Sequence, residues 1–542
     1  MSARSYANAP VVATFQPLPR EWADQLVETH VDTRTGWPAV AELRFRDPYH
    51  KLLARTGIGI GGPLKVSAVT TADLSRIQIF SGEVTRVACE ADEEGTYTTV
   101  RAQDLAHRLT RGRRLAVWKR TTLRKVVEEI ARHAKLTVGE VAHGSLSYRH
   151  LVQPNITDWE FLQSLAGLHG SVLGVQGTVL SLRTAVPARD APNPNQDSDQ
   201  SPYLLRYGGN LLALDTSVED LGPVRGVEVR GWNSDAREAV IARTGLRDSD
   251  GVAIGVGVSR LAAAWRGDAV TELAGTGFVL TEHVQAASRS FAEAASSDFV
   301  ELEATASGSP QLTAGSAVTL AGVGAPFAGR YTVTGAHHHF GPQGYRTTVS
   351  VATERRDPGA VPAGPASYAV PGLAVGIVVA VKEPEGRQNG AVKVTFPWLD
   401  DAYTSDWART VQWGGVGGGG VISPSQGDEV LVGFEQGRLD RPYVLGGLYN
   451  GKDKPPENKV DLVSGTGKVN RRSLASRGGD RIELLDADGS AGILLSTGDG
   501  AVQIQFDRAT KKLTLSADDI VLNAKWNVTI SGQKIDVKRG GV

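Results

Sequence analysis

The sequence has almost no cysteine and no long hydrophobic run. Cys89 is the single cysteine among 542 residues, which excludes an intramolecular disulfide and a zinc site built on paired thiolates. Nowhere does the chain approach the roughly 18 consecutive apolar residues of a membrane-spanning helix. Met1 to Arg20 also lacks the basic start, apolar core and cleavage site of a signal peptide. We therefore expect a chain that is made in the cytoplasm and stays soluble.

An excess of charge of one sign is also missing, and aromatic residues are scarce. Lys plus Arg total 58 against 59 Asp plus Glu, a formal charge of −1, so no overall field attracts nucleic acid or an anionic membrane. Aromatics make up 6% of the chain, whereas glycine supplies 63 of the 542 residues, which favours tight turns and short strands over long helices. At about 100–200 residues per domain, we expect a mainly β protein of several domains.

The first 356 residues are rich in strand-like patterns and contain a few helices. Apolar and polar residues alternate over Ala41–Phe45 and Ile77–Phe80. An apolar stripe predicts a helix over 122–134. A capping box of Thr157 and Glu160 predicts a second helix that ends at Gly170. One more helix is expected near 281–295.

A second region follows a Pro- and Gly-rich segment, residues 357–371, which has the composition of a linker. Residues 372–452 contain five strand-like runs with Gly-rich connections, which suit a small barrel of the OB type. The runs are Ala374–Val381, Ala391–Phe396, Arg409–Gln412, Glu429–Phe434 and Tyr443–Leu445. Residues 453–480 are expected to form a connector.

The last region, residues 481–542, repeats a pair of apolar residues two positions apart. The first members of successive pairs are separated by 11, 11, 9, 7, 8 and 7 residues. Each unit therefore supplies about one short strand and one turn. The pairs are Ile482/Leu484, Ile493/Leu495, Ile504/Phe506, Leu513/Leu515, Ile520/Leu522, Val528/Ile530 and Ile535/Val537.

This repeat predicts an obligate trimer. At about 25 cal/mol per Å² of apolar surface, an open meander from one chain would scarcely offset its conformational entropy. Three copies around an axis cover the apolar pairs and pair the strand edges, which gives an intertwined β-helix or prism whose core is these pairs. A β-sandwich or a single-chain solenoid is the alternative, although a solenoid coil needs about 20 residues or more.

Four ordered motifs resemble the spike OB domain of the VgrG-like spike proteins of contractile injection systems, which are related to contractile phage baseplate hub and spike proteins. The motifs are Gly390–Asp400, Trp407–Arg409, Pro424–Phe434 and Arg441–Asn450. The motif residues singled out are Phe396, Pro397, Trp398, Trp407, Arg409, Gly427, Asp428, Glu429, Gly433, Phe434, Pro442 and Gly446. Weaker matches upstream are Gln153–Leu162, Val227–Trp232 and Gly329–Thr334 with the histidines that follow it.

The resemblance implies an architecture and a function. Residues 1–356 would form a hub region with two tube-like β-barrel domains per chain, so that three chains make a pseudo-sixfold ring on the inner tube. The OB domain and the prism would project from this ring. The implied function is the homotrimeric central hub-spike of a phage-tail-like particle, joined to inner tube and baseplate proteins and driven through the target envelope on sheath contraction. Such a particle is assembled in the cytoplasm and is released or acts at the envelope.

Other readings of the resemblance stay open. The alternatives are the VgrG of a type VI secretion apparatus, a cell-wall hydrolase on a trimeric stalk and, for the OB domain, a nucleic-acid binder, although no nucleic-acid partner is predicted. Some relatives close their own tip with a metal held by histidines. Because no histidine follows His339, a separate PAAR-type tip protein is the expected partner at the C-terminal end, and a membrane is met only as the pierced target.

Two motifs that suggest nucleotide or nucleic-acid binding have simpler interpretations. Gly57-x-Gly59-x-x-Gly62 follows a helix-like segment and leads into a strand, the reverse of the dinucleotide-binding context, which predicts a loop. A basic cluster lacks regular aromatic interleaving, which favours a solvated turn or a protein contact. The cluster is Arg111, Arg113, Arg114, Lys119 and Arg120 with Trp118.

No metal site, cofactor or catalytic residue is predicted. His337 and His339 would share one face of a strand with His338 on the other, so a metal would need a third group, and packing is the preferred interpretation. Asp486–Gly489 lacks the remaining ligands of a calcium loop and is expected to be a β-turn.

The sequence also lacks recognisable catalytic motifs. There is no Gly-x-Ser-x-Gly elbow. Cys89 is expected to have no nearby histidine. Glu128 and Glu129 fall on the polar face of the helix predicted over 122–134, where such a pair is usually solvated, and not in a sugar cleft. We therefore predict that the protein is not an enzyme.

Overall fold

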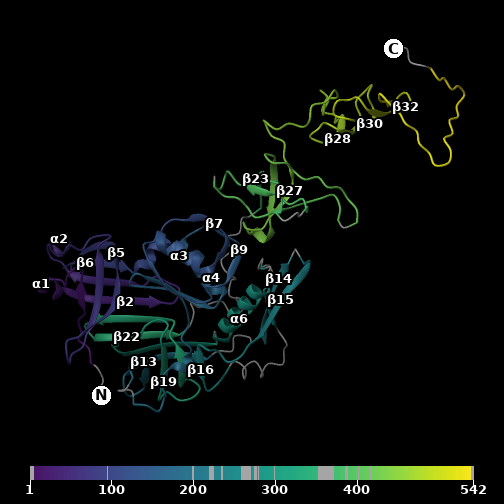
Figure 1. Cartoon of the computed structure of the whole chain (residues 1–542). Coiled ribbons are helices and arrows are strands. Elements are labelled where there is room, and N and C mark those ends of the chain that lie inside the picture. Colours follow the sequence, from purple (N-terminus) through teal and green to yellow (C-terminus); the bar gives the residue numbers. More distant parts are fainter. Residues whose placement is uncertain are drawn as a thin grey trace. The chain divides into compact units, whose positions relative to one another are not determined.

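The computed structural model describes residues 5–538 except 94, 198–200, 219–224, 234–235, 258–269, 274–277, 279, 298, 352–371, 385–387, 401 and 416. It forms two compact units, Met1–Gly447 and Leu448–Val542 (Figure 1). Both are built mainly from β-strands. The predicted linker, residues 357–371, lies outside the described residues.

A ten-stranded sheet is the largest element of the first unit, with the order β1-β4-β5-β6-β3-β2-β21-β22-β18-β13. Antiparallel pairing of β2 with β21 places Thr29 opposite Phe340, so strands from the two ends of the hub region lie side by side (Figure 1). The strands are Val11–Ala13 (β1), Leu26–Arg34 (β2), Val40–Arg46 (β3), Pro63–Val69 (β4), Arg76–Asp92 (β5), Gly95–Gln103 (β6), Leu211–Val218 (β13), Val300–Ser307 (β18), Gly335–Gly341 (β21) and Gly344–Val351 (β22).

Each half of this sheet has its own apolar core. On β3 the side chains of Ala41, Leu43 and Phe45 are fully buried, as their alternation predicts, and they pack with Val31, Leu64 and other residues of the N-terminal strands. A separate cluster around Leu302, Tyr331 and Val349 serves the late strands. The sheet therefore shelters its apolar face within one chain.

Helices and smaller sheets complete the hub region. The helix predicted over 122–134 is α3, and the capping box is present at the start of α4: the Glu160 amide donates to Thr157 Oγ1 over 3.1 Å. These elements are η1 (Leu105–Thr110), β7 (Arg114–Thr122), α3 (Leu123–His133), β8 (Thr137–Val141), β9 (Ser147–Ile156), α4 (Asp158–Leu168), β10 (Ser171–Gln176) and β11 (Val179–Thr184).

A last group of elements in the hub region includes α6 (Thr281–Ser297), which matches the helix predicted near 281–295 and packs its apolar face on β14 and β15. The others are α1 (Arg20–Ala23), α2 (Leu52–Thr56), η2 (Ala188–Asp190), β12 (Leu204–Arg206), β14 (Gly226–Asn233), β15 (Glu238–Gly245), β16 (Val252–Ile254), β17 (Val270–Leu273), β19 (Ala317–Ala321) and β20 (Gly329–Thr332).

The region predicted as an OB barrel contains a five-stranded sheet of order β24-β23-β26-β27-β25. Its strands match the five predicted runs. They are Leu373–Ala380 (β23), Lys393–Thr395 (β24), Arg409–Thr410 (β25), Glu429–Phe434 (β26) and Pro442–Gly447 (β27), with η5 (Glu435–Gly437) between the last two. Val378, Phe396 and Val432 are buried in its core.

The second unit contains a five-stranded antiparallel ladder in which each strand pairs with the next along the chain. Its strands are Arg471–Ala475 (β28), Arg481–Leu485 (β29), Gly492–Ser496 (β30), Gln503–Asp507 (β31) and Lys512–Ser516 (β32). The predicted turn at Asp486–Gly489 joins β29 to β30, and the Ser490 amide donates to the Ala487 carbonyl over 3.0 Å. Among the described residues, none of the helices has the length and apolar character required to cross a membrane.

Candidate functional surface

The apolar pairs of the C-terminal repeat form two continuous rows on one face of the ladder. Register places Ile482 opposite Leu495 and Leu484 opposite Ile493, and the pattern continues to β32. The first row is Leu474, Ile482, Leu495, Ile504 and Leu515, and the second is Leu484, Ile493, Phe506 and Leu513. We call these nine side chains the ladder face.

The ladder face is exposed in the single chain. Eight of its nine side chains keep between 37% and 56% of their surface accessible. Large contiguous apolar patches on soluble proteins mark interaction surfaces, and full burial of one Leu, Ile or Phe side chain stabilises by about 1.5–3 kcal/mol. The ladder face therefore has the apolar, exposed character that is typical of association surfaces.

The opposite face of the ladder is partly covered by its own chain, which buries Leu485 together with two charged residues. Glu483 is 2% exposed and Arg471 is 6% exposed. Arg471 lies 3.9 Å from the Glu483 carboxylate, and the Asn458 side chain donates to the same carboxylate. A single chain thus covers part of this face and leaves the more apolar ladder face open.

The last three apolar pairs have no strand partner. Residues 517–538 carry no strand in the part of the chain that the structure describes. Ile520, Leu522, Val528, Ile530, Ile535 and Val537 are 54–94% exposed. The expectation that these pairs form strands between chains stays a prediction.

The OB motif residues build and close the small barrel. Phe396 is fully buried, with ring centroids 5.5 Å from Phe434 and 5.7 Å from Trp398. The Trp398 indole donates to the Val375 carbonyl over 2.8 Å. Pro397 follows β24, and Glu429 and Gly433 lie on β26.

Further motif positions fix the loops and edges of the barrel. The Gly427 amide, at φ +92°, donates to the Val378 carbonyl over 2.8 Å, and Asp428 accepts from the Ser425 amide over 2.7 Å. Arg409 stacks over the Tyr443 ring at 4.8 Å, beside Pro442 and Gly446 on β27. Lys393 lies over the Trp407 ring at 5.2 Å. The contacts of these residues therefore stabilise the loops and edges of the five-stranded sheet.

The glycines of the rejected nucleotide motif lie in the predicted context, whereas the basic cluster is not a single solvated turn, because Arg114, Lys119 and Arg120 lie on β7. The glycines at 57–62 connect α2 to β4. Trp118 is buried and stacks on Phe161 with 5.3 Å between centroids, and Arg114 pairs with Asp158 at 3.4 Å. On α3, Glu129 accepts from the Trp118 indole over 2.8 Å, and Glu128 is exposed.

The prediction that Cys89 has no nearby histidine is wrong. Cys89 Sγ lies 3.3 Å from His50 Nδ1. His50 sits at φ +53° in the turn after β3, and pairing of β5 with β6 and of β6 with β3 brings this turn to Cys89. The contact arises from sheet topology, which spacing along the sequence does not reveal.

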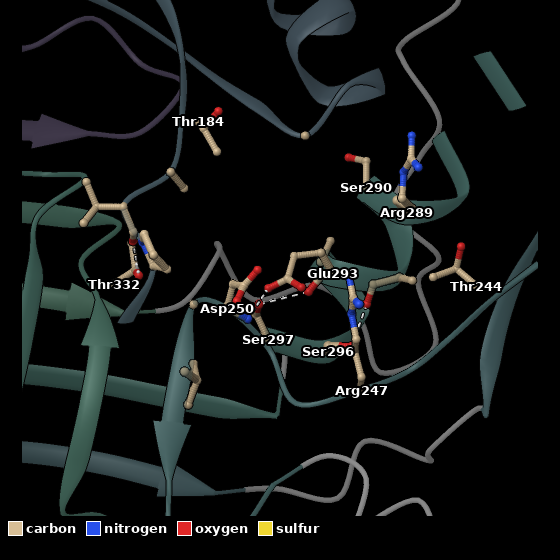
Figure 2. Close-up of a pocket in the computed structure, with 18 of the residues that line it drawn as sticks. Thr184, Thr244, Arg247, Asp250, Arg289, Ser290, Glu293, Ser296, Ser297 and Thr332 are labelled. Carbon is tan, nitrogen blue, oxygen red and sulfur yellow. Dashed lines mark hydrogen bonds between the residues drawn. The ribbon is translucent and has the colours of Figure 1, made fainter. Parts of the chain in front are cut away.

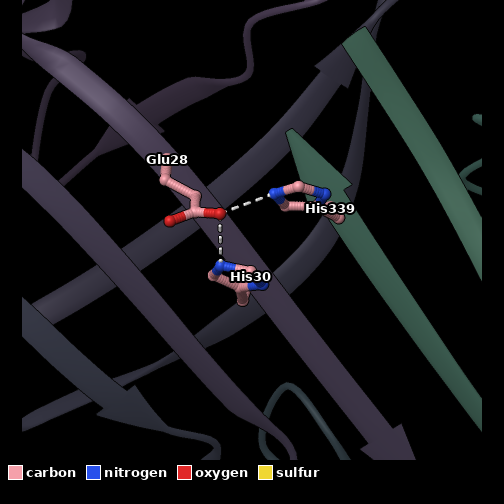
Figure 3. Close-up of side chains that lie close together, drawn as sticks. All are labelled: Glu28, His30 and His339. Carbon is pink, nitrogen blue, oxygen red and sulfur yellow. Dashed lines mark hydrogen bonds and ion pairs between the residues drawn. The ribbon is translucent and has the colours of Figure 1, made fainter. Parts of the chain in front are cut away.

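The three consecutive histidines of β21 alternate between faces as predicted. His338 is fully buried, and its Nδ1 lies 2.9 Å from the Tyr345 hydroxyl. Burial lowers the pKa of His338 to about 4. His337 and His339 lie on the other face. There β2 adds Glu28 and His30 beside His339 (Figure 3). The third group that a metal would need is therefore within reach, which the sequence analysis did not find.

A cavity of about 520 Å³ lies beside α6, lined by residues from distant parts of the hub region (Figure 2). Glu293 accepts from the Ser249 hydroxyl and the Asp250 amide, each over 2.7 Å. Asp250 pairs with Arg189 at 2.6 Å. Both carboxylates are thus engaged in structural contacts. The sequence analysis missed this cavity because its lining comes from segments spread over residues 143–351.

Comparison with known proteins gives matches in both regions of the first unit. The family described as the type VI secretion system/phage-baseplate injector OB domain matches residues 374–449. The Alg8 N-terminal domain matches residues 71–341, half of the chain.

Curated relatives match over a short segment. The type VI secretion system spike protein VgrG5 of Pseudomonas aeruginosa is 38% identical over 107 residues, which is 17% of this chain and 14% of that protein. VgrG2a of the same organism is 29% identical over 142 residues, 25% of this chain and 17% of that protein. Each match spans less than a fifth of the relative.

A solved structure matches over most of the chain. The half-lidded PdpA-VgrG complex of Francisella has a chain that is 9% identical with a TM-score of 0.55, covering 91% of this chain and 84% of that one. At this identity the likeness concerns the fold.

Proposed function

This chain belongs to the Alg8 N-terminal domain family and is a VgrG-like spike protein of contractile injection systems. From this premise, we propose that it works as a homotrimer. The trimer is the central hub-spike that joins the inner tube to a membrane-piercing tip. In this role the protein is driven through the target envelope when the sheath contracts. Its contribution is mechanical, through shape and stiffness.

One observation carries this proposal: the ladder face is apolar, regular and uncovered in a single chain. Three copies wrapped around an axis would place these rows against one another and remove them from water. Strands paired between chains around a dry axial core would resist bending under axial load. The exposed apolar pairs of residues 517–538 would extend the same prism toward the tip.

The oligomeric state tests this proposal directly. Light scattering on the purified full chain should give a mass of three chains, about three times 57.4 kDa, that persists in moderate denaturant. A stable monomer at micromolar concentration would exclude the trimeric spike.

We place the protein in a phage-tail-like particle that is assembled in the cytoplasm, with inner tube and baseplate proteins at the hub and a PAAR-type protein at the C-terminal tip. The relatives are spike proteins of type VI secretion systems, so a VgrG of such an apparatus is the alternative. Electron microscopy of particles carrying a tagged chain separates the two, because a free sheathed particle supports the first and a membrane-anchored assembly supports the second.

The proposal includes no catalysis. A cell-wall hydrolase on a trimeric stalk would need two free carboxylates that flank a sugar cleft, whereas Glu293 and Asp250 beside the cavity are held in structural contacts. Purified chain should leave peptidoglycan intact, and release of soluble fragments would support the hydrolase.

A further inference from the structure

A group of acidic and histidine side chains gathers where β2 meets β21. Glu28, His30 and Asp32 alternate along β2 and so point to one face of the sheet. The antiparallel register sets His30 opposite His339 and Asp32 opposite His337. Five groups that bind metals or protons therefore lie on one face, at the junction between the two halves of the ten-stranded sheet. Figure 3 shows three of them, Glu28, His30 and His339.

Three of these groups aim donor atoms at one point. Glu28 Oε1 lies 3.1 Å from His30 Nε2 and 2.8 Å from His339 Nε2. All three donor atoms lie within 4.8 Å of one another. A tetrahedral zinc ion with bonds of about 2.0–2.1 Å needs ligand atoms roughly 3.3 Å apart. The spacing of the side chains therefore suits such an ion after small rotamer adjustments.

Contacts behind His30 orient its ring. His337 Nδ1 lies 2.9 Å from Asp32 Oδ1, and a carboxylate only accepts, so His337 donates to Asp32. His337 Nε2 lies 3.2 Å from His30 Nδ1. These two contacts hold the Nε2 edge of His30 toward the Glu28 carboxylate, 3.1 Å away.

The nearest arginine on β3 is engaged elsewhere. Arg44 pairs with Glu90 at 3.3 Å and stacks over the Tyr97 ring at 4.1 Å. Arg86 and Arg101 also line the hollow beside Glu28, but the ion pairs of Glu28 are with His30 and His339.

The site is open enough for an ion to enter. The side chains of Glu28, His30 and His339 are 28–34% exposed. A polar hollow of about 290 Å³, lined by Glu28, His30 and residues of β3, β5 and β6, lies beside them. Two imidazoles and one carboxylate leave the fourth position of a tetrahedral ion to water.

We propose that Glu28, His30 and His339 bind one divalent transition-metal ion per chain, with zinc as the ion that best suits this donor set. Asp32 and His337 form an outer shell that orients His30. The ion joins β2 to β21 and so ties the N-terminal strands of the hub region to its late strands.

Zinc titration of the untagged full chain tests this site. After dialysis against a chelator, calorimetry should give one equivalent of Zn²⁺ per chain, and Co²⁺ should give the visible absorption of a tetrahedral ion. The variants H30Q, H339Q and E28Q should each lose this equivalent. D32N, which alters only the outer shell, should weaken binding by about 10–100-fold.

His133→Gln is the matched control, because His133 is an exposed histidine on α3 that lies outside the site. It should bind zinc like the wild type. Circular dichroism checks that each variant is folded, and E28Q keeps the side-chain shape if a histidine variant does not fold. Wild type without one bound equivalent would overturn the proposal, as would folded ligand variants that bind like H133Q. Binding that is lost only in C89S would place the ion at Cys89 and His50 and would overturn it too.

Discussion

The ten-stranded sheet of the hub region and the C-terminal ladder follow the same pattern with opposite results. All neighbouring strands of both sheets pair antiparallel, and the strands of both sheets alternate apolar with polar residues. Leu43 on β3 is fully buried, whereas Leu484 on β29 is 50% exposed. Alternation therefore shows that a strand has an apolar face, but it does not show which chain covers that face.

The difference lies in what the chain supplies around each sheet. The hub sheet has clusters such as Leu52 and Ile58 that close over its apolar side. The ladder receives only the connector before it, which covers Glu483 on its polar side. We expect the first to fold within one chain and the second to depend on partners, and the following experiments test this contrast.

A charge on the ladder face should have the largest effect. Ile504→Asp places three carboxylates at the centre of a trimer, where each buried ion costs several kcal/mol. We expect the trimer to dissociate, as measured by analytical ultracentrifugation. Gln505→Asp puts the same charge on the opposite face and should leave the trimer intact. If Ile504→Asp and Gln505→Asp had the same oligomeric state, the ladder would not depend on partners through its apolar face.

Truncation of equivalent leucines should separate the two regions by concentration dependence. Leu43→Ala and Leu515→Ala each remove buried methyl groups in the proposed assembly, at about 2–5 kcal/mol for a fully buried site. Stability lost in the hub variant should not depend on protein concentration, since its partners are in the same chain. Stability lost in the ladder variant should shrink as concentration rises. Thermal melts over a hundredfold concentration range would distinguish them.

Acid should destabilise the hub region through His169. Burial, together with His283 and His143, lowers the pKa of His169 to about 4, below the ordinary value of about 6.5. Between these values the unfolded chain binds a proton that the folded chain does not, so stability is complete above about pH 6.5 and is lost as pH falls toward 4. The loss is roughly 3 kcal/mol. Urea unfolding of the hub at several pH values measures it.

The matched variants separate the charge from the hydrogen bond. His169→Phe should reduce the pH dependence by the share of His169, while buried His338, whose pKa is also about 4, keeps its own share. Tyr148→Phe, which removes only the hydroxyl 2.8 Å from His169 Nε2, should leave the pH dependence unchanged. An unchanged slope in the first variant would show that another group is responsible.

The smallest effect is expected at the start of α4. Thr157→Ala removes the cap that the Glu160 amide uses and should cost about 1 kcal/mol. Hydrogen exchange should rise in the first turn of α4 and leave the ladder unchanged. Thr157→Ser keeps a capping hydroxyl and should restore protection. Loss of the trimer in Thr157→Ala would show that the two regions are coupled.

Local signals predicted much of this fold. The capping box at Thr157, the alternation over Ala41–Phe45 and the strand of the OB region at Glu429–Phe434 each depend on neighbours within a few residues, and the structure contains all three. The strands β29 to β32 also coincide with the first four predicted apolar pairs.

Contacts between distant segments could not be predicted in this way. Nothing in the spacing of His337–His339 indicates that Glu28 and His30 lie beside them, since this depends on which strand pairs with β21. The alternation of Glu28, His30 and Asp32 was the one available signal, and it becomes informative only once β2 is known to be the neighbour. The contact of Cys89 with His50 was missed for the same reason.

The pairing of β2 with β21 also governs the order of events during synthesis. Roughly 300 residues separate Arg34 from Gly335, and a ribosome that adds about 5–20 residues per second needs roughly 15–60 s to make them. Throughout that interval one edge of β2 has neither its native neighbour nor the groups that later surround it, and a bare strand edge recruits other chains. We therefore expect the nascent chain to be most prone to association with other chains before β21 is made, well before three copies assemble.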